Sequence, residues 1–154
     1  MRARYPFLRK VRLPLLALYS FTLVCAIIAS HTPERDLPGL HGMGKALHFT
    51  GFAGMSSLLI LMLAGFGELR IARVFWTLLF MAAYAALDES TQGWFERHPE
   101  FDDWLIDVTG TVLAVIFWEV VLAWVAARRR KLLRLQFKRP GIRVETDSTP
   151  TPRA

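Results

Sequence analysis

Four long apolar runs constrain this chain more than any other feature of its sequence. They span residues 13–30, 46–66, 71–87 and 104–127, and charged residues are nearly absent from all of them. An α-helix needs ~20 residues to cross the ~30 Å hydrocarbon core of a bilayer. The third run is short for this purpose, so we expect its helix to continue to about Gln92. The runs predict an all-α protein, a bundle of four transmembrane helices.

The composition excludes an ordinary soluble domain. Hydrophobic residues make up 53% of the chain and the mean hydropathy is +0.32, whereas a small soluble domain needs a largely polar surface. The net charge of +6 could indicate nucleic-acid binding, but lysine and arginine are concentrated in residues 1–12 and 128–154. Basic segments that flank apolar runs are typical of the cytoplasmic side of a membrane protein. We therefore expect no nucleic-acid partner.

The charges of the connecting segments predict the orientation. Residues 67–73 carry Arg70 and Arg73, whereas residues 31–45 and 88–103 are rich in aspartate and glutamate. Positively charged segments stay in the cytoplasm. Both termini and the 67–73 turn are therefore expected to be cytoplasmic, and the two acidic connections to lie outside.

These boundaries predict three parts of the chain. Residues 1–12 form a basic cytoplasmic N-terminus, residues 13–127 the four-helix membrane domain, and residues 128–154 a tail that is first basic and then disordered. The basic stretch 128–139 either lies along anionic headgroups or is a solvated end that fixes the topology. A basic segment before an apolar run can also be a cleaved signal peptide. The run 13–30 is long for a signal core, which favours an uncleaved helix.

Ionisable residues gather at one predicted depth. His48 lies one turn inside the second helix, next to Lys45 on the same face. Asp88 lies ~26 Å along the third helix from Ile71, at a rise of ~1.5 Å per residue. Asp107 lies one turn inside the fourth helix, and such groups should face one another or a wet cavity rather than lipid. The predicted ligand-binding residues at this outer boundary are Lys45, His48, Asp88, Glu89, Gln92, Arg97, Asp103 and Asp107.

Each of these residues also has an ordinary structural interpretation. His48 could be a hydrogen-bonded core histidine, Asp88 and Glu89 could simply end a helix, and Arg97 could form an exposed salt bridge with Asp103. Asp107 is harder to explain in this way, because it lies inside an apolar run.

Several residues are expected to serve packing rather than the site. Glu119 should either reach the cytoplasmic interface or pair with Arg73. The single cysteine, Cys25, should be a buried apolar residue. Three glycines should permit close helix approach: Gly51, Gly54 and Gly110.

The same polar motifs resemble the VanZ-like family of bacterial membrane proteins. The pattern comprises Lys-x-x-His-Phe from Lys45, Asp-Glu-x-x-Gln from Asp88, an Arg six residues before an Asp at Arg97, and a Gly at position 110. The chain departs from the family pattern in three places, because it has Gly44 for an acidic residue, Phe95-Glu96 for Pro-Gly, and Asp107 for the usual Asn. The resemblance implies a multi-pass protein of the bacterial plasma membrane with a site at these motifs.

Three functions are compatible with these residues. The favoured one is binding of an anionic lipid or cell-envelope intermediate, with Lys45 and Arg97 contacting the anionic group. The second is an enzyme acting on a lipid-linked substrate, with His48, Glu89 and Asp107 as candidate catalytic residues. Its metal-assisted version would use His48 and the carboxylates as ligands, but we expect no metal or other cofactor. The third is a structural or assembly subunit. The sequence leaves the oligomeric state open.

Overall fold

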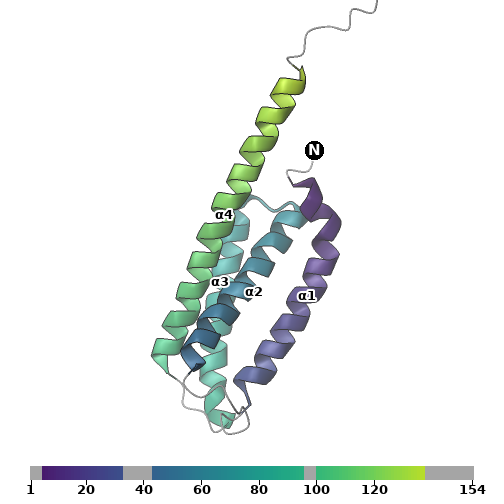
Figure 1. The fold of residues 1–154 in the computed structure, drawn as a ribbon. Coiled ribbons are helices and arrows are strands. Elements are labelled where there is room, and N and C mark those ends of the chain that lie inside the picture. The colour runs from purple at the N-terminus through teal and green to yellow at the C-terminus, as the bar shows by residue number, and fades with distance from the viewer. Residues whose placement is uncertain (1–4, 33–42, 96–99, 138–154) are drawn as a thin grey trace, which may run out of the picture.

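The computed structural model describes residues 5–32, 43–95 and 100–137, and within them every regular element is a helix. Helix α1 spans Pro6–Ser30, α2 Gly44–Phe66, α3 Arg70–Gln92 and α4 Phe101–Phe137, and a 3-10 turn, η2 (Gly93–Phe95), follows α3. The four α-helices lie side by side (Figure 1). Each is long and apolar enough to cross a membrane. The prediction of four spanning helices is confirmed, including the end of the third at Gln92.

Local sequence signals account for the helix ends. Pro6 occupies the first turn of α1, where its fixed φ suits a helix and its missing N–H costs nothing. Helix α2 ends at Gly67, which adopts a left-handed conformation with φ of 93°. Asp102 and Asp103 lie in the first turn of α4, where negative charge is favourable. These signals set the turn that returns the chain from α2 into α3 and fix the start of α4.

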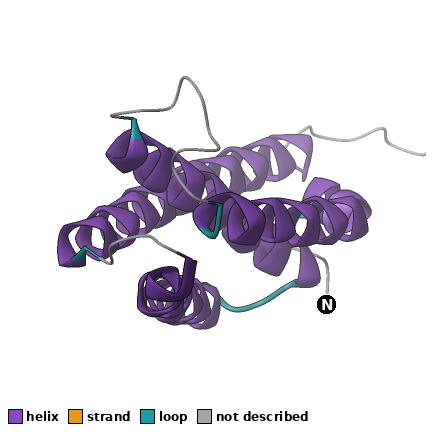
Figure 2. Ribbon diagram, turned by 90° about the horizontal axis from the view of Figure 1, so that it is seen from below, coloured by secondary structure: helices purple, strands orange, loops and turns teal. Residues whose placement is uncertain are grey.

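Helix α2 is the centre of the bundle. It packs extensively against both α1 and α4, while α3 packs mainly against α4 and barely touches α1. The helices alternate in direction, so the start of α1 and the end of α4 lie at the same end of the bundle (Figure 1). Figure 2 views the opposite end, where α1 and α3 finish and α2 and α4 begin. Four helix ends therefore meet there.

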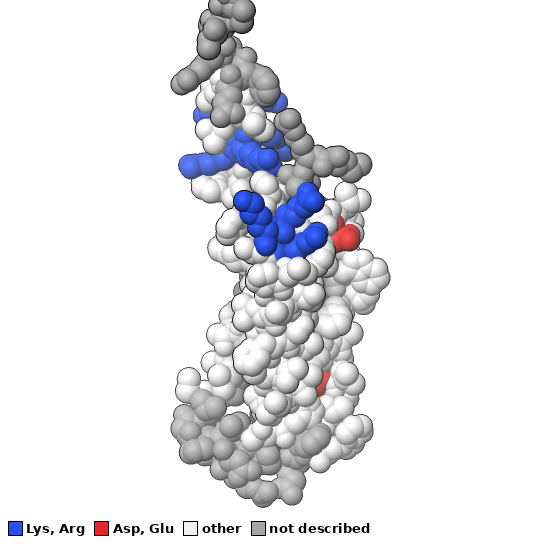
Figure 3. Space-filling view, turned by 90° about the vertical axis from the view of Figure 1, so that its right-hand side faces the viewer, with Lys and Arg blue, Asp and Glu red and all other residues white. Residues whose placement is uncertain are grey.

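The bundle has an apolar exterior and polar groups inside. Most of its large exposed side chains are hydrophobic, and the middle of the face seen in Figure 3 is almost free of lysine and arginine, which gather toward the end where α4 projects. Polar side chains cannot be satisfied by lipid, so they face inward in a membrane bundle. The buried polar residues are Ser56, Arg73, Thr77, Asp88, Glu89, Gln92, Asp107, Thr111 and Glu119.

Two glycines bring helices into backbone contact. A Cβ at Gly110 would lie 2.6 Å from the carbonyl oxygen of Phe49, so α4 and α2 meet there as predicted. A second close approach joins α2 to α1, because a Cβ at Gly65 would lie 2.8 Å from the carbonyl oxygen of Leu8. The same expectation is wrong for Gly51 and Gly54, because no neighbouring atom lies within 4 Å of a Cβ at either position.

The expected pairing of Glu119 with Arg73 is confirmed. Arg73 is only 1% exposed, and its Nε and Nη2 donate to the two carboxylate oxygens of Glu119 at 2.6 and 2.9 Å. Arg70 adds a third contact to Glu119, with 3.0 Å between Nε and Oε2. This ion network joins α3 to α4 near the end where α3 begins, away from the polar residues at the other end of α3.

Two features differ from the sequence-based expectation. Cys25 is exposed on α1 rather than buried, since α1 uses few of its side chains for packing. Helix α4 does not stop near residue 127 but continues to Phe137, projecting beyond the other helices (Figure 1). Residues 128–137 contain no glycine or proline to end the helix.

Candidate polar site at one end of the bundle

His48 is the centre of the polar cluster at the end where α2 and α4 begin. Its Nδ1 lies 3.1 Å from Oδ1 and 3.3 Å from Oδ2 of Asp107. Asp107 is completely buried, because the close approach of α4 to α2 at Gly110 shields it from the exterior. A carboxylate so placed accepts a hydrogen bond from the Nδ1–H of the imidazole and fixes the orientation of the ring.

Two further carboxylates face His48 from α3 and α4. Glu89 Oε1 lies 4.0 Å from Nδ1, and Asp103 Oδ2 lies 3.8 Å from Nε2. The Glu89 carboxylate also accepts from Gln92 Nε2 at 3.1 Å and from the backbone N–H of Glu100 at 3.0 Å. The other oxygen of Asp103, Oδ1, is buried and has no hydrogen-bond partner among the residues that the structure describes. His48, Glu89, Asp103 and Asp107 thus form one cluster, which we call the His48 cluster.

A second set of polar contacts ties α1 to α3 beside this cluster. Ser30 donates to Asp88 Oδ1 at 2.6 Å, and Gln92 Nε2 donates to Asp88 Oδ2 at 3.3 Å. His31 Nε2 lies 2.9 Å from the Thr91 hydroxyl oxygen. Sequence reasoning missed Ser30 and His31, although Ser30 ends the first apolar run at the depth of Asp88 and His31 follows it. That shared depth was the available signal.

A groove of about 380 Å³ lies between α1 and α2, with Tyr84 and Asp88 of α3 also in its lining, and it reaches these polar residues. Gly51 leaves open space in it, and Cys25 lines it from α1. His48, Asp88 and Ser30 are its main polar members, while its other lining is largely apolar. The lining residues are Thr22, Cys25, Ala26, Ala29, Ser30, Gly44, Leu47, His48, Gly51, Phe52, Met55, Tyr84 and Asp88.

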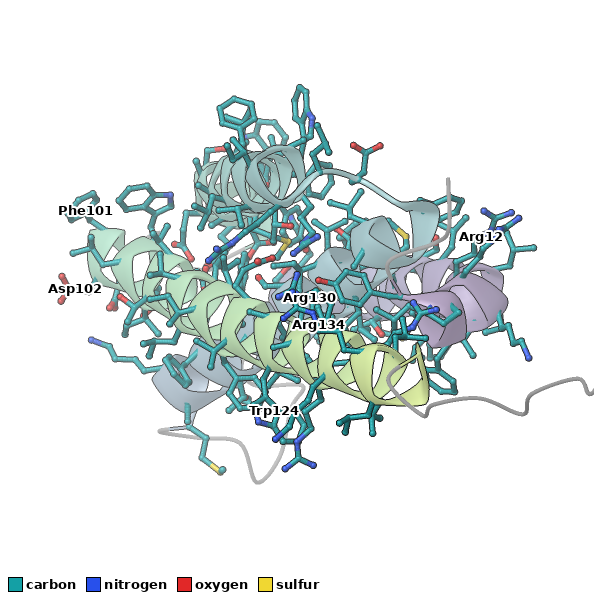
Figure 4. All side chains as sticks on the ribbon, turned by 90° about the horizontal axis from the view of Figure 1, so that it is seen from above. Arg12, Phe101, Asp102, Trp124, Arg130 and Arg134 are labelled. Carbon is teal, nitrogen blue, oxygen red and sulfur yellow. The ribbon has the colours of Figure 1, made fainter. Side chains whose placement is uncertain are left out.

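The two predicted cations are not part of the described cluster. The side chain of Lys45 is 59% exposed, and its Nζ lies 4.0 Å from Glu100 and 3.9 Å from Asp102. Asp102 points outward from the start of α4 (Figure 4). Lys45 therefore stands at the rim of the site. Arg97 lies outside the residues that the structure describes.

In the His48 cluster, the carboxylates of Glu89, Asp103 and Asp107 are hydrogen-bond acceptors that surround one imidazole. In the described segments, no hydroxyl or thiol group is hydrogen-bonded to His48, so no activated serine, threonine or cysteine nucleophile is present there. The cluster can bind a cation, orient a polar headgroup or exchange a proton through His48. Its position at the end of an apolar groove joins this chemistry to a surface that lipid can reach.

The comparisons with known proteins bear on the family. Neither the curated proteins nor the solved structures give a match to this chain. The family model described as VanZ/LLP1 matches residues 6–123, which include all of α1, α2 and α3 and most of α4. The match covers the groove and the His48 cluster, and with four candidate membrane spans the chain belongs to the VanZ/LLP1 family as a multi-pass membrane protein.

Proposed function

We propose that this protein binds one phosphate-bearing lipid or lipid-linked envelope intermediate at the outer face of the bacterial plasma membrane. The apolar chain of the ligand would occupy the groove between α1 and α2, and its headgroup would lie at the polar end of that groove. Both termini would face the cytoplasm, as the basic ends of the chain indicate.

The observation that carries this proposal is the joining of an apolar groove to ionisable groups. Ligand sites are concave, largely apolar and supplied with a few convergent polar groups, with volumes of roughly 300–1,000 Å³. The groove, at about 380 Å³, has this character, because His48 and Asp88 end an otherwise apolar lining. Cys25 and Gly51 are exposed in this groove, which supports an opening toward lipid. This arrangement favours an amphiphilic ligand over a water-soluble one.

The headgroup would be held at the rim by Lys45 and Arg97. Lys45 is exposed and only loosely paired, which leaves its ammonium group accessible to an anion. A guanidinium such as that of Arg97 can grip a phosphate with two parallel hydrogen bonds. The carboxylates of Asp88 and Glu89 would accept hydrogen bonds from headgroup hydroxyl or amine groups.

The groove can be closed without disturbing the fold. A Gly51→Leu variant should fill it, since a Cβ at this position has no neighbour within 4 Å. Gly54→Leu is the matched control, because Gly54 has equal space on the same helix but does not line the groove. Both changes replace a helix-weakening glycine, which is worth up to about 1 kcal/mol of helix propensity.

The measurement is the phosphate-bearing lipid retained per chain after purification in mild detergent. We expect retention in the wild type and in Gly54→Leu, and loss in Gly51→Leu. Lys45→Gln and Arg97→Gln should also lose lipid while inserting and folding normally. Equal retention by Gly51→Leu and Gly54→Leu would refute the groove as the binding site, and unchanged retention in both cation variants would refute the headgroup assignment.

Cys25 supplies an independent reporter. It is the only cysteine of the chain and it lines the groove. Added phospholipid should slow its reaction with a maleimide in the wild type and leave the rate unchanged in Gly51→Leu. A rate in the wild type that does not depend on lipid would contradict occupation of the groove.

The contact between His48 and Asp107 favours a second candidate, an enzyme acting on a lipid-linked substrate. A buried carboxylate that orients an imidazole is an arrangement used in general acid–base catalysis. If the protein is an enzyme, the bound lipid should release a water-soluble headgroup over time in the wild type and not in His48→Gln. Intact lipid after prolonged incubation would leave binding as the function.

A further inference from the structure

The His48 cluster carries more negative charge than its described neighbours balance. Glu89, Asp103 and Asp107 surround a single imidazole, so the cluster stays negative even with His48 protonated. Among residues 5–32, 43–95 and 100–137, no lysine or arginine forms an ion pair with these three carboxylates. Uncompensated charge at the end of a membrane bundle is costly. The geometry therefore calls for a cation.

The orientation of His48 leaves one ring nitrogen available to that cation. Because Asp107 accepts a hydrogen bond from Nδ1–H, the hydrogen-bond network assigns the proton to Nδ1 and the lone pair to Nε2. Nε2 faces Asp103 Oδ2 at 3.8 Å, so two acceptors point toward the same space. Metal-binding histidines commonly donate their other N–H to a carboxylate in this way. Asp107 has the position of such a carboxylate.

The distances in the cluster suit a shared ion. His48, Glu89 and Asp103 each offer a ligand atom, and these atoms lie within 4.8 Å of one another. Bonds of ~2.1 Å to a central metal hold two ligand atoms up to ~4.2 Å apart, so binding would draw the ligand atoms inward, and Glu89, which lies 4.0 Å from Nδ1, would have to turn toward Nε2. Within the described segments, Asp103 Oδ1 is buried without a hydrogen-bond partner and supplies a further acceptor.

We propose that His48, Glu89 and Asp103 bind one divalent cation, with Asp107 as the positioning residue that orients His48. One imidazole with carboxylates favours Zn²⁺ or Mn²⁺ over Ca²⁺ and Mg²⁺, which prefer all-oxygen sites. This reverses the sequence-based expectation of no metal. His48 also lines the groove, so a bound ion would have an open side toward a phosphate headgroup; this last clause alone rests on the proposed function.

The test is titration of the full chain with Zn²⁺ in detergent, after treatment with a chelator and removal of any histidine tag. The wild type should bind one ion per chain. Asp103→Asn should weaken this binding by at least about 100-fold, and Asp107→Asn, which only orients His48, by about 10-fold. Asp102→Asn is the matched control, because Asp102 is the adjacent residue, is 72% exposed and points outward (Figure 4). It should bind like the wild type.

Three results would overturn the metal site. They are no saturable binding of Zn²⁺ or Mn²⁺ by the wild type, equal affinity in Asp103→Asn and the wild type, and an equal loss in Asp102→Asn and Asp103→Asn. Circular dichroism of each variant identifies any loss caused by unfolding. If His48→Gln fails to fold, the visible spectrum of bound Co²⁺ reports imidazole coordination in the wild type, and a spectrum with oxygen ligands alone would refute the proposal.

The same preparations separate the metal site from lipid binding. Gly51→Leu should lose lipid and keep the metal, because the substitution fills the groove, changes none of the proposed ligands and adds a Cβ with no neighbouring atom within 4 Å. Asp103→Asn should lose the metal. Loss of metal binding in Gly51→Leu would refute a site formed by the cluster alone, whereas failure of the wild type to retain lipid would refute only the proposed function.

Discussion

Replacing Glu119 by glutamine should destabilise the bundle by about 3 kcal/mol. The change leaves Arg73 buried without its charged partner, and breaking a buried ion pair costs roughly 3–5 kcal/mol. Arg73 retains two weaker contacts, a 3.4 Å hydrogen bond to the carbonyl oxygen of Glu68 and the ring of Tyr5 at 5.7 Å. These contacts place the expected cost at the lower end of that range.

Replacing Arg73 instead of Glu119 should cost less stability. In Arg73→Met, Glu119 keeps Arg70 as a partner at 3.0 Å, and Arg70 is 65% exposed and free to adjust. We expect a loss of about 1–2 kcal/mol. In the double variant Arg73→Met with Glu119→Leu no buried charge is left unpaired, so its stability should lie within about 1 kcal/mol of the wild type.

The assay is equilibrium unfolding in mixed micelles, followed by circular dichroism, for the wild type, both single variants and the double variant. The structure predicts that the two single losses are unequal and that the double variant recovers most of the stability. Equal losses in the single variants would show that Arg70 does not support Glu119. Additive losses in the double variant would refute the explanation by an uncompensated buried charge.

Three further changes test other parts of the structure. Gly110→Ala should destabilise the bundle by about 1–3 kcal/mol, because its Cβ would meet the Phe49 carbonyl oxygen at 2.6 Å. Gly54→Ala should not destabilise it, and equal unfolding midpoints for the two variants in the same assay would contradict the close approach at Gly110. Ser30→Ala should remove the 2.6 Å hydrogen bond to Asp88 and increase amide exchange near the end of α1, and unchanged protection would show that this bond does not hold α1. Reporters fused to either terminus should be active on the cytoplasmic side, and an active extracytoplasmic reporter would reverse the proposed orientation.

The sequence predicted the helices well, because a membrane span is set by length and hydropathy alone. It offered the pair between Arg73 and Glu119 as one of two alternatives, and the structure shows the pair. Depth grouped His48 with Asp107 and with Asp88 or Glu89, and of these Glu89 and Asp107 lie beside the imidazole. The rise per residue depends only on the helix itself, so the depth of a residue can be predicted without knowing how the helices pack.

Rotation about each helix axis was much harder to predict. Gly51 and Gly54 were expected at helix contacts, but only Gly110 and the overlooked Gly65 lie at them, because composition does not say which side of a helix faces a neighbour. Cys25 was expected to be buried for the same reason. The groove was invisible in the sequence, since it depends on the space that α1 leaves beside α2.

The projecting end of α4 carries basic residues at different distances from the bundle. The helix continues ten residues past the apolar run that ends at residue 127, or ~15 Å at the helical rise, and the Arg128 guanidinium lies 4.1 Å from the ring centroid of Trp124. Electrostatic screening at physiological salt reduces interactions beyond ~8 Å. With the orientation proposed above, Arg128 would stay within the field of anionic headgroups, whereas Arg134, six residues or ~9 Å further along the same helix, would lie beyond it. That outer turn would then offer its charge to the aqueous phase rather than to the membrane that anchors the helix.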